Sequence, residues 1–123
     1  MKIVIADDSL VFREKIKDLV MLNKKVTIVD EARNGIEAIQ LVHEKEPDLL
    51  ILDIQMPEMN GIKVLEALKK NKHKTKICVF TNYPYPQYQK RCIQEGADYF
   101  FDKNIDFQEV KNLIVQLAQK RSG

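Results

Sequence analysis

Short apolar runs alternate along the chain with longer segments in which apolar residues recur at helical spacing. Apolar runs bounded by polar residues predict strands near residues 2–6, 26–30, 49–53, 77–81 and 98–101. Apolar residues three and four positions apart predict amphipathic helices near residues 10–22, 35–46, 61–71, 86–95 and 106–120. This regular alternation with short connections favours an α/β fold, in which helices cover both faces of a parallel sheet.

The predicted helix ends carry residues that suit them. Ser9 precedes the first helix and can cap it, because its side-chain oxygen can accept a hydrogen bond from a free backbone N–H. Pro86 suits the first position of the fourth helix, and Gly96 suits the left-handed residue that ends it.

Composition and charge narrow the function classes. A chain of 123 residues, 45% hydrophobic and 31% charged, predicts one soluble globular domain. The net charge of +2 gives no reason to expect a nucleic-acid partner. Only four apolar residues separate Met1-Lys2 from the first acids, which is too few for a signal peptide, and no run could span a bilayer. We therefore expect a cytoplasmic protein without membrane contact, with Cys78 and Cys92 as buried free thiols.

Three carboxylates follow predicted strands directly. Asp7 and Asp8 come after Ile3-Val4-Ile5-Ala6, and Asp53 comes after Leu49-Leu50-Ile51-Leu52. Fully apolar runs of this kind are typical of parallel strands buried on both faces, and open α/β sheets bind ligands at the carboxyl edge. Crowded carboxylates repel one another unless a cation lies between them, and oxygen ligands suit Mg²⁺. The pattern therefore predicts a magnesium site.

Two more polar residues end predicted strands, Thr81 after the fourth and Lys103 after the fifth. Each of these residues has an ordinary explanation by itself, since acids and hydroxyls commonly cap helices and loop lysines are commonly solvated. Because parallel strands end at one edge, all five side chains are expected around a single pocket. Five such residues occur together at the ends of strands by chance far less often than any one of them does.

The chain resembles the receiver domain of bacterial two-component response regulators over essentially its whole length. The matching segments are Ile5-Ala6-Asp7-Asp8-Ser9, Leu52 through Gly61, Phe80-Thr81, and Gly96 through Lys103. The resemblance implies a flavodoxin-like, doubly wound five-stranded sheet in the order 2-1-3-4-5. It also implies one receiver domain over residues 1–123, similar to the single-domain form that acts in chemotaxis and has no output domain.

The resemblance assigns Asp53 as the phosphorylation site, accepting a phosphoryl group from a histidine kinase or a histidine phosphotransfer protein. It implies that Asp8 binds Mg²⁺ directly, that Asp7 binds it directly or through water, and that Asp53 and the backbone carbonyl of Gln55 complete the ligands. Lys103 would neutralise charge during transfer. Phosphoryl transfer needs positioning and charge neutralisation more than covalent chemistry, which fits these residues.

The resemblance also implies a switch. Phosphorylation adds charge and acceptor oxygens to Asp53, the hydroxyl of Thr81 turns toward them, and Phe100 repacks in the fifth strand. Gln55 and Tyr83 flank the path of the water that hydrolyses the phosphoaspartate, and Tyr83 is expected to slow hydrolysis by shielding it.

Three positions depart from the family pattern. Asn82 follows Thr81 where a small residue is usual, and this larger amide is expected to crowd the phosphoryl site. Phe100 replaces the frequent tyrosine and cannot donate a hydroxyl hydrogen bond. Asn104 follows Lys103 where many relatives carry a proline after a cis bond, so the geometry of that bond is left open.

The leading hypothesis is a phosphorylation-dependent signalling protein that contacts a downstream output protein and is no enzyme beyond its own phosphorylation and dephosphorylation. Dimerisation through the fourth helix, fifth strand and fifth helix is left open. One alternative is the receiver portion of a longer DNA-binding regulator. Another is a Mg²⁺-dependent phosphohydrolase, although Gln55 stands where phosphatases of the haloacid-dehalogenase type need an aspartate. A third is a flavodoxin-like cofactor binder, although the first β–α loop lacks a phosphate cradle.

Overall fold

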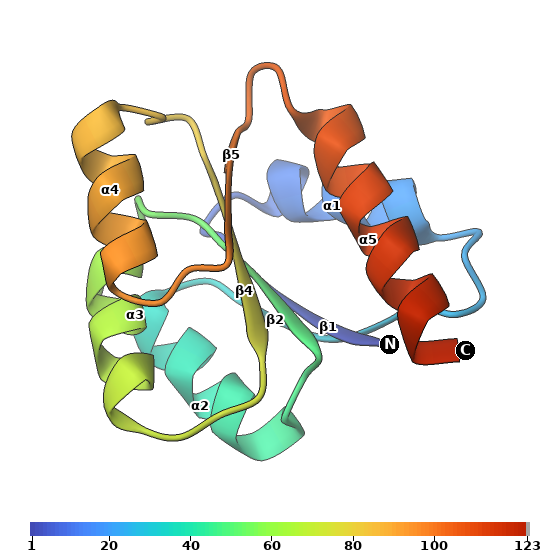
Figure 1. Cartoon of the computed structure of the whole chain (residues 1–123), viewed down its shortest axis with the longest axis horizontal. Helices are drawn as coiled ribbons and strands as arrows, with labels where there is room; N and C mark the ends of the chain where they lie inside the picture. Colours follow the sequence, from blue (N-terminus) through green and yellow to red (C-terminus); the bar gives the residue numbers. More distant parts are fainter. Residues whose placement is uncertain (123) are drawn as a thin grey trace.

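Five strands and five helices alternate within residues 1–122, which the computed structural model describes, with side chains described through Lys120 (Figure 1). Gly123, the last residue of the predicted domain, lies outside the described residues. The strands are β1 (Lys2–Ala6), β2 (Thr27–Ala32), β3 (Leu49–Leu52), β4 (Lys76–Thr81) and β5 (Tyr99–Asp102). The helices are α1 (Leu10–Val20), α2 (Gly35–Lys45), α3 (Gly61–Lys70), α4 (Pro86–Gln94) and α5 (Phe107–Ser122).

The strands form one parallel sheet in the order β2-β1-β3-β4-β5, as the resemblance predicted. This order places β1 beside β3 although α1, β2 and α2 separate them in the sequence. Their register pairs Ile3 with Leu49 and Ala6 with Leu52, so both strands end at the same level. The residues that follow β1 and β3 therefore lie side by side.

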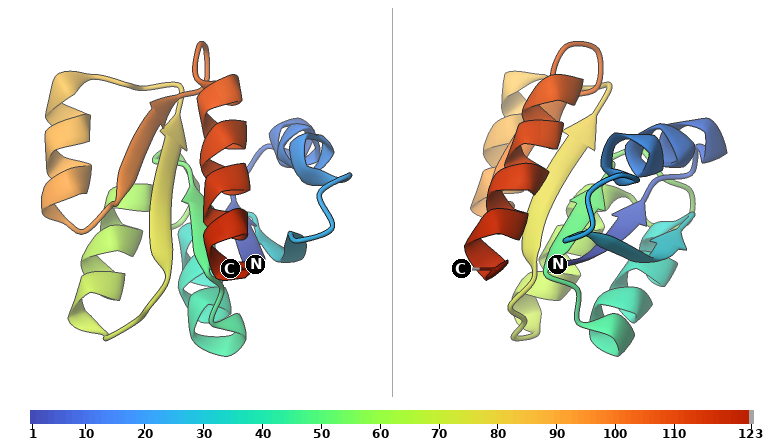
Figure 2. Two further views of the ribbon diagram at one scale, coloured as in Figure 1. Left: turned by 45° about the vertical axis from the view of Figure 1, so that its right-hand side comes forward. Right: turned by 90° about the vertical axis from the view of Figure 1, so that its right-hand side faces the viewer.

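Side chains of the central strands pack alternately into two hydrophobic clusters. Ile3 and Ile5 pack toward α1 and α5, whereas Val4 and Ala6 pack toward α2 and α3. All four are at most 1% exposed, which explains why this strand reads as a continuous apolar run. Figures 1 and 2 show the same division, with α1 and α5 on one face of the sheet and α2, α3 and α4 on the other.

The first helix and second strand differ from their predicted bounds. α1 ends at Val20 instead of residue 22, because a turn closes there with Asn23 N–H bonded to the Val20 carbonyl at 2.9 Å. Met21 and Leu22 are consequently exposed rather than part of the helical stripe. β2 begins one residue later than predicted and ends two residues later.

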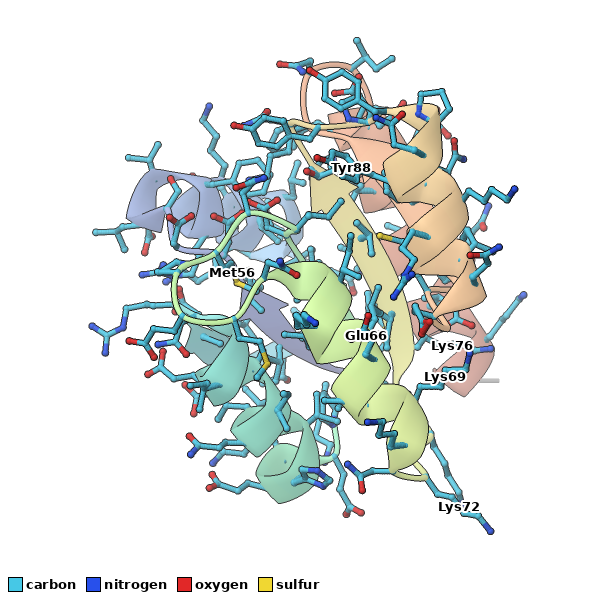
Figure 3. All side chains as sticks on the ribbon, turned by 90° about the vertical axis from the view of Figure 1, so that its left-hand side faces the viewer. Met56, Glu66, Lys69, Lys72, Lys76 and Tyr88 are labelled. Carbon is cyan, nitrogen blue, oxygen red and sulfur yellow. The ribbon has the colours of Figure 1, made fainter. Side chains whose placement is uncertain are left out.

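The α4 helix is held weakly. Among its apolar residues, Cys92 is buried and Tyr88 packs at the edge of the hydrophobic cluster, but Ile93 is 49% exposed. Polar contacts to α3 supplement this packing. Arg91 pairs with Glu66, whose position on α3 Figure 3 shows. Exposed ion pairs contribute little stability, so α4 has few strong contacts to keep it in one place.

The start of α3 lies unusually close to the end of β3. Asn60 caps the helix, and the Gly61 N–H bonds the Ile54 carbonyl at 2.8 Å. A Cβ atom on Gly61 would lie 2.3 Å from the backbone oxygen of Asp53. Glycine is therefore required here for close approach, and that approach holds the backbone around Asp53.

Among the described helices, none combines the length and apolar character needed to cross a bilayer.

Candidate functional site

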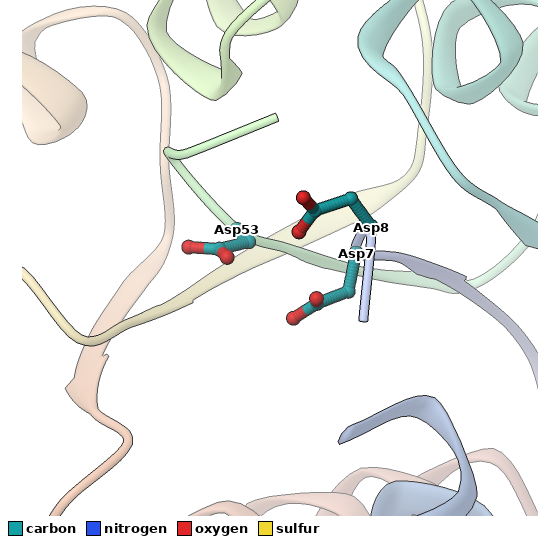
Figure 4. Close-up of side chains that lie close together, drawn as sticks. All are labelled: Asp7, Asp8 and Asp53. Atoms are coloured by element: carbon teal, nitrogen blue, oxygen red, sulfur yellow. The ribbon is translucent and has the colours of Figure 1, made fainter. Parts of the chain in front are cut away.

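Three acids converge at the carboxyl edge of the sheet. Asp7 and Asp8 follow β1 and Asp53 follows β3, and one carboxylate oxygen from each lies within 4.8 Å of the others (Figure 4). Asp7 and Asp53 are buried, whereas Asp8 is exposed. The cluster thus combines two acids withdrawn from solvent with one that remains accessible.

Lys103 contacts two of these three acids. Its backbone N–H bonds the Thr81 carbonyl at 2.9 Å, which fixes the start of the β5–α5 loop against the end of β4. Its ammonium Nζ donates to Asp7 Oδ2 at 2.7 Å and to Asp53 Oδ2 at 3.0 Å. The side chain is only 6% exposed. A single ammonium group therefore bridges the two buried carboxylates and offsets part of their repulsion.

Burial raises the pKa of Asp53 above the ordinary aspartate value of 3.8. The positive charge of Lys103 acts in the opposite direction, and the negative charge of Asp7 raises the pKa further. Hydrogen bonds from Lys103 and from the Gln55 N–H favour the ionised form. The effect of desolvation is larger than that of the favourable partners, so keeping the Asp53 carboxylate ionised reduces the stability of the folded protein.

Thr81 is the last residue of β4 and is fully buried. Its hydroxyl oxygen accepts a hydrogen bond from the Tyr83 N–H at 3.0 Å. The hydroxyl hydrogen remains a donor, because this bond uses only a lone pair of the oxygen. Thr81 can therefore donate to a new acceptor, and a rotation to do so would release the backbone of the β4–α4 loop.

The remaining predicted residues are more exposed than Thr81 and the buried acids. Gln55 is exposed, and its N–H lies 3.4 Å from Asp53 Oδ1. Tyr83 is 40% exposed, with its ring centroid 6.4 Å from that of Tyr85. Phe100 pairs with Val79 across the sheet and packs, half-buried, against the α2–α4 side of the core. Of these residues, Gln55 is linked to Asp53 through its backbone N–H and Tyr83 is linked to Thr81 in the same way.

The structure describes two of the positions that depart from the family pattern. Asn82, directly after Thr81, is exposed. The described chain contains no cis peptide bond, so the bond between Lys103 and Asn104 is trans.

The sequence prediction missed a buried arginine that supports the acids. Arg13 is 7% exposed, and its Nη1 donates to the backbone carbonyl of Asp7 at 2.7 Å. Its Nε donates to Glu31 on β2 at 3.0 Å. Arg13 thus ties α1 to β2 and holds the backbone that carries Asp7. Its spacing of three residues before Ile16, on the apolar face of α1, was a signal that this cation is buried.

The donor set fits a hard divalent cation. The three acids offer oxygen atoms only, which Mg²⁺ prefers, and their separation leaves room for one ion between them. Lys103 pairs with Asp7 and Asp53, whereas Asp8 is exposed to solvent and therefore accessible to an incoming ion. The chemistry and spacing of these residues therefore fit magnesium.

The two cysteines are free and buried, as predicted. Burial raises the pKa of the Cys92 thiol to about 11 and that of Cys78 further still. Both thiols are therefore protonated at neutral pH and are poor nucleophiles.

Comparison with known proteins agrees with this geometry. The family model of the response regulator receiver domain matches residues 3–115. The transcriptional regulatory protein YdfI of Bacillus subtilis is 41% identical over 96 residues, which cover 78% of this chain and 45% of YdfI. The chain spans about half the length of the curated relatives it matches, between 45% and 55% for the first three.

Solved structures show the same fold. The signal receiver domain of a response regulator NarL from Mycobacterium tuberculosis superposes with a TM-score of 0.87 at 28% identity, covering 96% of this chain and 95% of that one. The CheX–CheY–BeF₃–Mg²⁺ complex from Borrelia burgdorferi gives a TM-score of 0.85 at 25% identity, covering 95% of this chain and 88% of that one. The chain therefore belongs to the response regulator receiver domain family.

Proposed function

We propose that the chain is a phosphorylation-dependent signalling switch whose phosphoryl acceptor is Asp53. The observation that carries this proposal is the buried Asp53 carboxylate, bonded to Lys103 and grouped with Asp7 and Asp8 at the sheet edge. The donor would be a phosphohistidine on a histidine kinase or on a histidine phosphotransfer protein. A downstream protein would then recognise the phosphorylated form through protein contacts.

Magnesium would be held by Asp7, Asp8 and Asp53 together with the backbone carbonyl of Gln55. When bound, it would neutralise negative charge on the carboxylates and on the phosphoryl oxygens. Receiver domains typically use this ion, and the solved CheX–CheY complex of Borrelia burgdorferi contains Mg²⁺. The all-oxygen donor set of this chain supports the same use here.

In the transfer, an oxygen of the Asp53 carboxylate attacks the phosphorus atom. A phosphorus–oxygen bond forms as the phosphorus–nitrogen bond to the donor histidine breaks, and that histidine leaves with the electron pair and takes up a proton. The Lys103 ammonium, already 3.0 Å from Asp53 Oδ2, offsets the charge that gathers on the phosphoryl oxygens. Water later attacks the phosphoaspartate, a mixed anhydride; the bond between the phosphorus and the aspartate oxygen breaks, inorganic phosphate leaves and the carboxylate is restored.

The same groups can pass the signal on. Phosphorylation brings Asp53 from a charge of −1 close to −2 and adds acceptor oxygens, toward which the free donor of Thr81 can turn. That rotation would release the Tyr83 N–H and loosen the loop before α4. Because α4 is weakly anchored, a small change in its surroundings can shift its packing together with Phe100. The face formed by α4, β5 and α5 would then meet the output protein or a second copy.

Incubation with acetyl phosphate and Mg²⁺ tests the proposal. We expect mass spectrometry to find one labile phosphoryl group on Asp53, and EDTA to prevent its formation. Rapid turnover of many phosphate esters would instead indicate the phosphohydrolase alternative. A yellow protein that retains a flavin on purification would indicate the cofactor binder. Absence of any adduct under conditions that phosphorylate a known receiver domain would overturn the proposal.

Replacement of Tyr83 by alanine is expected to shorten the phosphoryl lifetime severalfold. The side chain is partly exposed and its backbone is bonded to Thr81, so we expect its ring to limit the approach of water. Loss of acid-labile label after removal of the donor measures the lifetime. The Tyr83→Phe variant keeps the ring and should behave like the wild type. An unchanged or longer lifetime in the alanine variant would contradict this prediction.

A second candidate is the receiver portion of a longer DNA-binding transcription regulator. It is favoured by the relative YdfI, a transcriptional regulatory protein of which the matched region covers 45%. Reading the native coding sequence past codon 123 tests it. An immediate stop codon would exclude it, and an open frame that encodes a helical DNA-binding domain would support it.

A further inference from the structure

The Lys103 ammonium has a third neighbour besides its two carboxylates. The ring of Phe12, on the first turn of α1, lies beneath it with 3.8 Å between Nζ and the ring centroid. An aromatic face carries partial negative charge, so it attracts a cation at this distance, and the attraction is strongest where water is excluded. The Lys103 side chain is 6% exposed, which meets that condition.

The Phe12 ring is itself held by two other rings. Phe80 on β4 packs against it nearly edge to face at 5.2 Å between centroids, and Phe107 on α5 lies at 5.3 Å. Phe80 and Phe107 lie 5.1 Å apart, so the three rings form a closed group. Contacts from two neighbours restrict the tilt of Phe12 and keep its face directed at the ammonium.

We propose that Phe12 is a positioning residue for phosphoryl transfer, which acts by holding the Lys103 ammonium between Asp7 and Asp53 through its aromatic face. This inference rests on the proposed function of Asp53. Lysine has a long, flexible stem, and its ammonium must lie in one place for its charge to stabilise the transferring group. The carboxylates attract it from one side, and the ring supplies a charge-compatible surface on another side. An aliphatic residue could fill the same volume but would offer no such attraction.

Fluorination of the ring tests this attraction while nearly preserving ring shape. Mono-, di- and trifluorophenylalanine, introduced at position 12, withdraw negative charge from the ring face stepwise. We expect the rate of Asp53 labelling by acetyl phosphate to fall stepwise, by about tenfold over the series, which is the size expected for a buried cation–π contact. The same series at Phe101 on β5 is the matched control. That ring is half-buried against the same hydrophobic cluster as Phe12 but lies outside the group of three rings, so it should change the rate little.

A second readout does not depend on phosphorylation. Protons of the Lys103 side chain that lie over the Phe12 face should show upfield ring-current shifts in the NMR spectrum of the metal-free protein. The Phe12→Leu variant should lose these shifts, and the Phe12→Tyr variant should keep both them and the labelling rate. Thermal unfolding of every variant checks that the fold is retained.

The outcomes separate the two proposals. If the wild-type protein takes up no phosphoryl group, the proposed function fails whatever the NMR spectrum shows. If the wild type is labelled but the rate is the same throughout the Phe12 series, or falls equally in the Phe101 series, the role of Phe12 is refuted. Absence of ring-current shifts on Lys103 would likewise refute it.

Discussion

Replacing Asp53 by asparagine is expected to abolish phosphoryl uptake. The amide retains the size of the side chain but is a far weaker nucleophile than a carboxylate and cannot form the acyl phosphate. We expect no acid-labile label above background after incubation with acetyl phosphate and Mg²⁺. The Asp8→Asn variant is a useful comparison, because it removes an accessible carboxylate from the same cluster and leaves the acceptor in place. Persistent labelling of the Asp53→Asn variant at wild-type stoichiometry would place the acceptor elsewhere.

The same variant should alter how stability depends on pH in EDTA. Burial raises the pKa of Asp53 in the folded protein above 3.8, so the folded state holds its proton more tightly than the unfolded chain. As the pH rises from about this value through the raised pKa, the unfolded chain gains relative stability, and above that pKa the difference is constant. The amide does not titrate and lacks this component.

Urea unfolding of both proteins between pH 4 and 8 in EDTA measures the effect, with ΔG values on the order of 5–15 kcal/mol expected for a domain of this kind. The free energy of unfolding of the wild type minus that of the Asp53→Asn variant should fall with rising pH and then level. A difference that rises with pH would mean that Lys103 outweighs burial and would contradict the direction assigned to this pKa.

Replacing Gly61 by alanine is expected to lower the free energy of unfolding by about 2–3 kcal/mol. An added Cβ would lie 2.3 Å from the Asp53 carbonyl oxygen and 2.8 Å from the Ile54 Cα, and neither backbone atom can move without displacing the acceptor. Alanine is otherwise preferred over glycine in a helix by about 1 kcal/mol, so a loss would identify the steric conflict. Phosphoryl uptake should also slow by about tenfold or more, because Asp53 would be misplaced.

The Gly96→Ala variant is the matched control for Gly61. Gly96 has φ of 102° and open space where a Cβ would lie, so the substitution strains only the backbone. It should cost about 1–2 kcal/mol and leave the labelling rate unchanged. Urea unfolding and acetyl phosphate labelling measure both variants. Wild-type stability and rate in the Gly61→Ala variant would show that α3 can shift away from β3 without consequence.

The chain pattern predicted the central acids because their positions depend on local features. Asp7 and Asp53 each follow a fully apolar run, and such a run shows where a buried strand ends. Thr81 and Lys103 were found by the same reasoning. Their position at one edge then follows from parallel pairing of the strands. The bounds of α1 were less well predicted, because Met21 and Leu22 continue the apolar pattern beyond the turn that ends the helix.

Supporting contacts were beyond the reach of the sequence pattern. Phe12 lies within the first predicted helix, and nothing in its spacing indicated a contact with the Lys103 ammonium. The role of Arg13 was missed because its bond to the Asp7 carbonyl depends on where α1 crosses the sheet. Contacts of this kind join segments that are distant in the sequence, and the pattern of neighbouring residues does not determine how close those segments lie in the fold.

By itself, the sequence determined the order of strands and helices and which polar residues end the strands, because periodicity and helix-end preferences act over a few neighbouring residues. The pairing of β1 with β3 was implied by the family resemblance but by no local pattern, and only the tertiary structure shows that Lys103 reaches Asp7 and Asp53 across 96 and 50 positions of the chain. It also decided how closely Gly61 approaches Asp53. These distances follow from helices packing jointly on a sheet, where many weak contacts set one arrangement that no short segment specifies.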